Sequence, residues 1–252
     1  MFKMEMNIVQ NELPELRKRL LSEYKYKIEL HAHTKPMSSC SDIKPEKMAE
    51  VYSGLGYDGI VITNHFTHKQ FASLSKEESI EKYIKDYEDT KKAAEKYGLK
   101  VYLGAEIRFT ENMNDYLVYG VNKELLEIMY DYLPQGLSKF RESVHMENSI
   151  FIQAHPFRNG CEFADARYLD GIETFNMHPN HNSRVGVAVR HAAKSGLKIT
   201  TAGSDYHHLN CDNEGLAALR VKAMPSDSFG LAEILKNGDY LFEIGDSAIV
   251  LA

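Results

Sequence analysis

The chain has 252 residues, 43% of them hydrophobic, which is enough for one sizeable core, and composition alone leaves one large domain as plausible as two. Its formal net charge of −6 argues against a broad nucleic-acid surface but not against a small anionic substrate. Three scattered cysteines favour reduced thiols. Because neither an apolar run of about 18 residues nor the apolar core of a secretory leader is present, we expect a cytoplasmic protein without membrane contacts.

Hydrophobic periodicity predicts helices alternating with short apolar strands along most of the chain. The expected helices cover residues 11–23, 43–52, 76–97, 137–147, 183–194 and 226–236. The expected strands run from residue 26 to the His31–His33 pair and over residues 58–63, 100–104, 116–119, 149–154, 171–176, 197–202 and 219–223. This alternation is typical of βαβ units and predicts a parallel sheet, either closed or open. For the tail, residues 216–252, the pattern predicts elements but no role.

Polar side chains follow the first, second, third, fifth and seventh of these strands. Parallel strands place such positions at their carboxyl ends, which a barrel gathers onto one face. An open sheet gathers them only near the point where the strand order reverses. Five contributing strands therefore favour a barrel.

The first strand ends in His31-Ala32-His33, so both imidazoles leave it on the same side. Two convergent imidazoles suit a divalent ion such as zinc, manganese or iron. A pair of this kind also arises by chance in loops, so the residues at the later strand ends decide whether it belongs to a metal site.

The later motifs are Ser41-Asp42, Thr63-Asn64-His65, Gly104-Ala105-Glu106, Ala154-His155-Pro156 and Gly203-Ser204-Asp205-Tyr206-His207. With His31-Ala32-His33 they occur in the order found in the PHP (polymerase and histidinol phosphatase) family, which residues 26–210 resemble. The resemblance implies one domain over residues 1–252, folded as a distorted (β/α)7 TIM-like barrel. It also implies two or three divalent metal ions at the carboxyl ends of the strands and the hydrolysis of phosphate esters.

The resemblance also implies which side chains would hold each ion. His31, His33, Glu106 and Asp205 would hold one ion, Asp42, His65 and His207 a second, and His155 with the bridging Glu106 a third. Some relatives carry a further histidine about eleven residues after this glutamate. Here the neighbourhood contains Asp115 instead, which could substitute, or the third site could be weak or empty.

Two metals about 3.5–4 Å apart can share a hydroxide and hold the phosphoryl oxygens, so no side-chain nucleophile is needed. Phosphate also requires fixed positive charge, for which Arg158 is the first candidate, followed by Arg108 and Arg184. His178 and His181, in the loop after the sixth strand, are candidates for contact with the leaving group or for the general acid.

The leading hypothesis is a metal-dependent phosphoesterase acting on a small phosphomonoester, such as a histidinol-phosphate-like compound or a nucleotide phosphate. Alternatives are a 3'-to-5' exonuclease or oligonucleotide hydrolase with the same metal centre, and a metal-stabilised scaffold without activity. The acidic charge and the absence of a basic stripe count against the second. The nearly complete set of ligand motifs counts against the third. For single residues the competing interpretations are a helix-terminus contact for Asp42 and a surface ion pair for Arg158.

Overall fold

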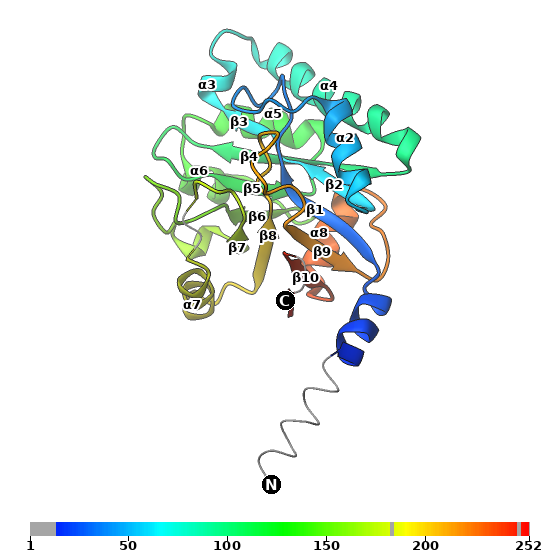
Figure 1. Ribbon diagram of the computed structural model, residues 1–252. Coiled ribbons are helices and arrows are strands. Elements are labelled where there is room, and N and C mark those ends of the chain that lie inside the picture. The colour runs from blue at the N-terminus through cyan, green and yellow to red at the C-terminus, as the bar shows by residue number, and fades with distance from the viewer. Residues whose placement is uncertain (1–13, 182–183, 246–247, 252) are drawn as a thin grey trace.

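The computed structural model describes residues 14–181, 184–245 and 248–251, and its strands form one curved sheet (Figure 1). The strands are β1 (Tyr26–Ala32), β2 (Gly59–Ile62), β3 (His65–Thr67), β4 (Lys100–Arg108), β5 (Tyr116–Tyr119), β6 (Ile150–Gln153), β7 (Gly171–Asn176), β8 (Ile199–Gly203), β9 (Ala217–Val221), β10 (Leu241–Ile244) and β11 (Ala248–Leu251). They pair in the order β11-β10-β9-β1-β2-β4-β5-β6-β7-β8, and β3 adds to β4.

The sheet curves into a nearly closed barrel, in which the segment after β8 meets the end of β1. The backbone N–H of His33 donates to the carbonyl of Tyr206 at 3.1 Å, and the N–H of Tyr206 lies 3.4 Å from the carbonyl of His31. Ala32 and Tyr206 form a parallel bridge. The predicted barrel-type α/β fold is therefore confirmed, and the ends of β1 and β8 lie side by side.

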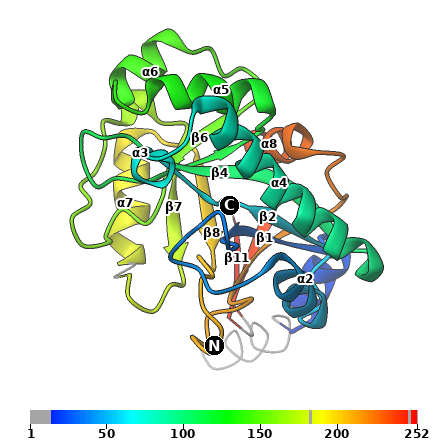
Figure 2. The same ribbon diagram turned by 90° about the horizontal axis from the view of Figure 1, so that it is seen from above.

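Helices surround this barrel (Figure 2). They are α2 (Pro45–Gly54), α3 (His68–Phe71), α4 (Lys76–Ala94), α5 (Lys123–Tyr132), α6 (Leu137–Ser143), α7 (Val185–Ser195) and α8 (Ser228–Asn237), with one further helix over residues 14–23. In α4 the Ser75 side chain accepts from the N–H of Glu78, and the Glu78 carboxylate accepts from the N–H of Ser75, which fixes where the helix begins. Among the described residues, no helix is long and apolar enough to cross a membrane.

Two features differ from the predicted alternation. β5 runs antiparallel to both β4 and β6, because only residues 109–115 connect it to β4, too few for a parallel crossover. Beyond β1, β9 pairs antiparallel to β1, and β10 and β11 extend the sheet with further antiparallel pairs. β3, α3, α5, β10 and β11 were not predicted, whereas the helix expected over 137–147 ends at Ser143. Residues 11–13 and 183 of the expected helices lie outside the described residues.

The contact between β7 and β8 provides a test of the barrel wall. A Cβ on Gly171 would lie 2.1 Å from the backbone carbonyl oxygen of Ile199, so an alanine there would force the two strands apart. We expect Gly171→Ala to lower the free energy of unfolding by about 2–3 kcal/mol, measured by urea denaturation.

The matched control is Gly54→Ala at the end of α2, where an added Cβ meets nothing within 4 Å. Its stability should be unchanged or raised by up to about 1 kcal/mol. Equal stability of the two variants would contradict the close packing of β7 on β8.

Candidate metal centre

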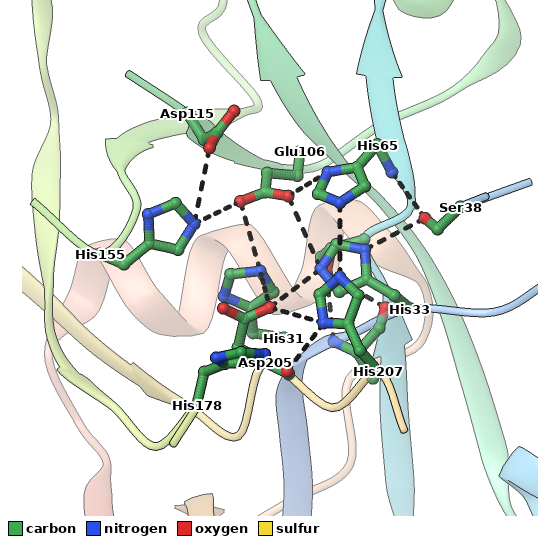
Figure 3. Close-up of polar contacts among 12 residues, drawn as sticks. His31, His33, Ser38, His65, Glu106, Asp115, His155, His178, Asp205 and His207 are labelled. Carbon is green, nitrogen blue, oxygen red and sulfur yellow. Dashed lines mark hydrogen bonds and ion pairs between the residues drawn. The ribbon is translucent and has the colours of Figure 1, made fainter. Parts of the chain in front are cut away.

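Acidic and imidazole side chains from five parts of the barrel point toward one centre (Figure 3). β1 supplies His31 and is followed by His33, β4 supplies Glu106, and the segment after β8 supplies Asp205. These four side chains are buried, with at most 1% of each residue exposed. His65 begins β3, His155 follows β6, and His207 lies two residues beyond Asp205, so strand ends carry all of these groups.

His31 and His33 are each held by a hydrogen bond at Nδ1. The Nδ1 of His31 lies 2.8 Å from the carboxylate of Glu173, which can only accept when ionised. The Nδ1 of His33 lies 3.2 Å from Oγ of Ser38, whose own hydrogen goes to Oδ1 of Asn64 at 2.8 Å. Both Nδ1 atoms are therefore donors, which leaves the Nε2 lone pair of each ring directed at the centre.

Four buried atoms at the centre have no hydrogen-bond partner: Nε2 of His31, Nε2 of His33, Oε2 of Glu106 and Oδ1 of Asp205. Asp205 Oδ1 lies 3.4 and 3.3 Å from the two nitrogens, and the nearest Glu106 oxygens lie 3.6 Å from each. Ligands 2.0–2.1 Å from one tetrahedral ion are about 3.3–3.4 Å apart. The spacing, burial and chemistry of this donor set therefore fit a divalent metal ion.

The charge states of Glu106, Asp205 and His33 suit a cation. Burial would raise the pKa of Glu106, but His65, His155 and His31 hold it well below its usual value. Burial likewise opposes ionisation of Asp205, and neighbouring His31 and His207 nevertheless lower its pKa strongly. Burial and the neighbouring imidazoles also lower the pKa of His33 well below 6.5, which leaves it neutral. Ionised carboxylates and a neutral imidazole are the forms that bind metals.

A second group of imidazoles borders the first. His33, His65 and His207 form one of the clusters that could hold an ion, and Nε2 of His65 lies 3.4 Å from Nε2 of His207. The thiol of Cys40 lies 3.1 Å from the same nitrogen of His65. Burial tends to raise the pKa of Cys40, but hydrogen bonds from His207 and His65 lower it to about 6.

The structure does not bring Asp42 into this group. Its carboxylate accepts from the backbone N–H of Leu209 at 3.1 Å and lies 3.3 Å from Nδ1 of His208. The Asp42 side chain is 53% exposed and belongs to none of the clusters found among the described residues.

At the expected third site, His155 contacts Glu106, but Asp115 is already paired. Nε2 of His155 lies 2.7 Å from Glu106 and 3.7 Å from Asp115. Arg108 donates to both oxygens of Asp115 at 2.6 Å, and Arg158 donates to one of them at 2.7 Å. Asp115 is 1% exposed, so the two guanidinium groups compensate its buried charge without an ion.

The cluster lies at the floor of a pocket of about 570 Å³. Arg108, Arg158, His178 and His181, the candidates for contact with the substrate or for the general acid, line this pocket. Arg184 does not line it, and its guanidinium lies 5.8 Å from the centre of the Phe157 ring instead.

The two histidines of the β7 loop differ in their surroundings. Nδ1 of His178 accepts from the N–H of Asn180 at 3.2 Å, and burial is the main cause that lowers its pKa to about 4. His178 is therefore neutral and presents an Nε2–H donor. Nδ1 of His181 lies 3.0 Å from Oδ2 of Asp205 and 3.2 Å from Oδ1 of Asn176.

Two of the residues at strand ends have left-handed backbone conformations. His155 has a φ of 21° and Asp205 a φ of 50°, both unusual for residues with a Cβ. Such a conformation costs on the order of 1–3 kcal/mol and persists only where the surroundings enforce it. Here the N–H of His155 donates to Glu173 at 2.8 Å, which helps to hold the turn.

Sequence reasoning missed several supporting residues, most clearly Glu173 and Glu29. Glu173 contacts His31 and the N–H of His155, and Glu29 accepts from the N–H groups of His31 and Ser204 at 2.9 Å. Both acids lie inside apolar strand runs, where a buried charge requires a partner. That position is the signal in the sequence that could have identified them. Nothing in the sequence distinguishes Cys40 in the same way.

The motifs at the strand ends lie within the region that matches a known domain family. The model of the PHP domain matches residues 29–210. The chain belongs to the PHP domain family. No curated protein matches it in sequence.

Solved structures resemble this PHP chain in fold. A two-domain protein from Bacteroides vulgatus, which contains a predicted PHP-like metal-dependent phosphoesterase, is 16% identical, with a TM-score of 0.60 over 87% of this chain and 65% of that one. The PHP chain thus spans about two thirds of the Bacteroides protein. A candidate metal-dependent phosphoesterase from Bifidobacterium adolescentis is 15% identical, with a TM-score of 0.51 over 84% and 96%. PsfC from Pseudomonas syringae is 17% identical, with a TM-score of 0.53 over 80% and 84%.

The role of the central imidazoles can be tested by metal content. We expect His33→Ala to lose at least one bound ion per chain, because its Nε2 is a buried ligand atom without a hydrogen-bond partner and belongs to both groups. Elemental analysis of protein reconstituted with zinc or manganese gives the measurement. The control is His145→Ala, since His145 is exposed after α6 and should leave metal content unchanged. Full metal content in both variants would contradict the assignment of His33.

Proposed function

We propose that this PHP chain is a metal-dependent phosphoesterase that hydrolyses a small phosphomonoester. The observation that carries the proposal is the buried set of unpartnered ligand atoms of His31, His33, Glu106 and Asp205 beside a pocket with two fixed arginines. The descriptions of the Bacteroides and Bifidobacterium proteins as phosphoesterases support the same reaction class. In this proposal the substrate is small because the pocket of about 570 Å³ fits a single metabolite.

Two divalent ions fit this donor set better than three. His31, His33, Glu106 and Asp205 would hold the first, and His65 and His207 the second. Asp115 is committed to Arg108 and Arg158, which argues against a third. When bound, such ions lower the pKa of a water molecule and stabilise charge on the phosphoryl oxygens.

Arg108 and Arg158 are the proposed phosphate-binding groups. Asp115 neutralises one of their two charges, so the trio presents a net charge of about +1 to the pocket. Lys69 and Lys82 also line the pocket and add to its positive potential. Because Asp115 fixes the arginines, substrate binding requires little further ordering of these side chains.

His181 is the proposed general acid for the leaving group. Its Nδ1–H points to Asp205, an orientation that leaves Nε2 available for proton transfer, as in other imidazoles oriented by a carboxylate. His178 is neutral and its Nε2–H can only donate a hydrogen bond, so we assign it substrate contact rather than proton transfer.

The deciding experiment is a phosphatase screen of chelator-treated protein reconstituted with zinc, manganese or iron. Release of phosphate from an aryl phosphate and from mononucleotides, absent without metal and in His33→Ala, would support the proposal. A bis-aryl phosphodiester and a short labelled RNA test the nuclease alternative, since their exclusive hydrolysis would replace the monoesterase. A metal-loaded protein inert toward all of these esters would overturn the catalytic proposal.

The phosphate-binding role of Arg158 gives a sharper prediction. Arg158→Ala should reduce kcat/KM for a phosphomonoester by about 100-fold, because a fixed, charge-assisted donor to the phosphoryl group is lost. The matched control is Arg167→Ala, whose guanidinium is exposed and pairs with Asp165 away from the pocket. Steady-state kinetics with matched metal content give the comparison. An Arg158→Ala enzyme as active as the control would contradict the role of Arg158 in binding phosphate.

A further inference from the structure

The thiol of Cys40 lies where the second ion requires another protein ligand. Two imidazoles alone, those of His65 and His207, leave an ion at this position underligated, because catalytic zinc sites use three protein ligands. Asp42, the acid suggested by the motif, turns its exposed carboxylate toward His208 and Leu209. Cys40 lines the pocket with His65 and His207, and its Sγ is 3.1 Å from Nε2 of His65.

The Nε2 atoms of the two imidazoles face one another. Nδ1 of His65 lies 2.6 Å from Glu106 Oε2, and Nδ1 of His207 lies 2.9 Å from the backbone carbonyl of Asp205. The carbonyl can only accept, so Nδ1 of His207 is the donor and its Nε2 is the atom left to bind a cation. Nε2 of His65 is the ring nitrogen that faces it. These two Nε2 atoms are 3.4 Å apart, close to the value of about 3.3–3.4 Å for two nitrogens on one tetrahedral zinc.

Support for cations in this part of the site comes from His33. This residue is fully buried, its Nε2 has no hydrogen-bond partner, and it belongs to the cluster formed with His65 and His207. A sulfur and a nitrogen on one tetrahedral zinc are about 3.6 Å apart, so Cys40 would move outward by about 0.5 Å. The exposed position of Cys40 allows this shift.

We propose that Cys40, rather than Asp42, is the third protein ligand of the ion held by His65 and His207. The proposal rests on the metal-dependent chemistry proposed above and adds a prediction about which metal this position selects. Thiolate favours zinc, cobalt or iron, whereas carboxylate and water ligands suit manganese and magnesium. The second position of this chain is therefore selective for softer, thiophilic ions.

Cobalt(II) gives a direct readout, because a cobalt–thiolate bond produces a charge-transfer absorption in the near ultraviolet. The full chain is stripped with chelator and titrated with cobalt chloride alone, as wild type, Cys40→Ser, Cys161→Ser and Cys211→Ser. We expect the band in every protein except Cys40→Ser, together with at least about tenfold weaker binding of one cobalt ion in that variant. Thermal melting of the metal-free proteins checks that each variant folds.

Cys161 is the rival thiol, because it belongs to the loop after His155, and Cys211 is the matched control. Absence of the band in the folded wild type, its persistence in Cys40→Ser, or its loss in folded Cys161→Ser would overturn the proposal. A band without phosphatase activity would leave the ligand assignment intact and reject the proposed function. Activity without a band would do the reverse.

Two further variants separate Cys40 from Asp42. Asp42→Asn should retain both the cobalt band and the full metal stoichiometry, since its carboxylate points away from the imidazoles. Cys40→Asp should remove the band and shift the preference of one site toward manganese, measured by competition between zinc and manganese ions. Loss of an ion in Asp42→Asn but not in Cys40→Ser would assign the site to Asp42 instead.

Discussion

Two buried carboxylates, Glu106 and Asp205, are the constraint on which this structure depends. Ionised acids are costly to remove from water unless positive charge or hydrogen-bond donors surround them. Here the surroundings are imidazoles from β1, β3 and the segments after β6 and β8, most of them with Nδ1 already committed as a donor. Glu173 contacts Nδ1 of His31 and orients that ring, and Glu29 accepts from the backbone N–H groups of His31 and Ser204.

The same backbone contacts close the barrel and bring the residues of the site together. Tyr206 accepts from the backbone of His33 and approaches the carbonyl of His31, and it stands between Asp205 and His207 in the chain. Joining β1 to the segment after β8 therefore places two pairs of ligands in contact. Asp205 turns the chain at this junction in a left-handed conformation, and the contacts of its carboxylate with His31 and His33 require a side chain there.

Much of the site could be predicted because strand ends are simple to locate. Apolar runs such as 58–63 and 149–154 mark their own ends, and parallel strands gather those ends on one face. The direction of β5 was harder to predict, because it depends on the length of the 109–115 connection rather than on the residues of the strand. β10 and β11 extend the sheet beyond β9 and pair through backbone groups, for which the side chains give little signal.

The loop over residues 34–42 contains a ligand-type residue whose orientation the motif did not predict. Sequence order identifies Asp42 as the ligand-type residue, but in the structure its backbone N–H donates to the carbonyl of His207 while its carboxylate turns outward. The path of a loop depends on such tertiary hydrogen bonds, which no local pattern encodes. In the sequence Arg108, Arg158 and Asp115 are three separate candidates, and only the folded chain shows that they form one ion-paired unit.

That ion-paired unit separates two kinds of recognition within a single pocket. Its charges are covalently attached to the chain and its geometry is fixed by Asp115, so this wall of the pocket is permanent. In the proposed function, the side of the pocket formed by the metal centre gains positive charge when it binds metal ions. If the proposed function holds, removal of the metal ions would abolish hydrolysis, while the two arginines would still bind a phosphate ester.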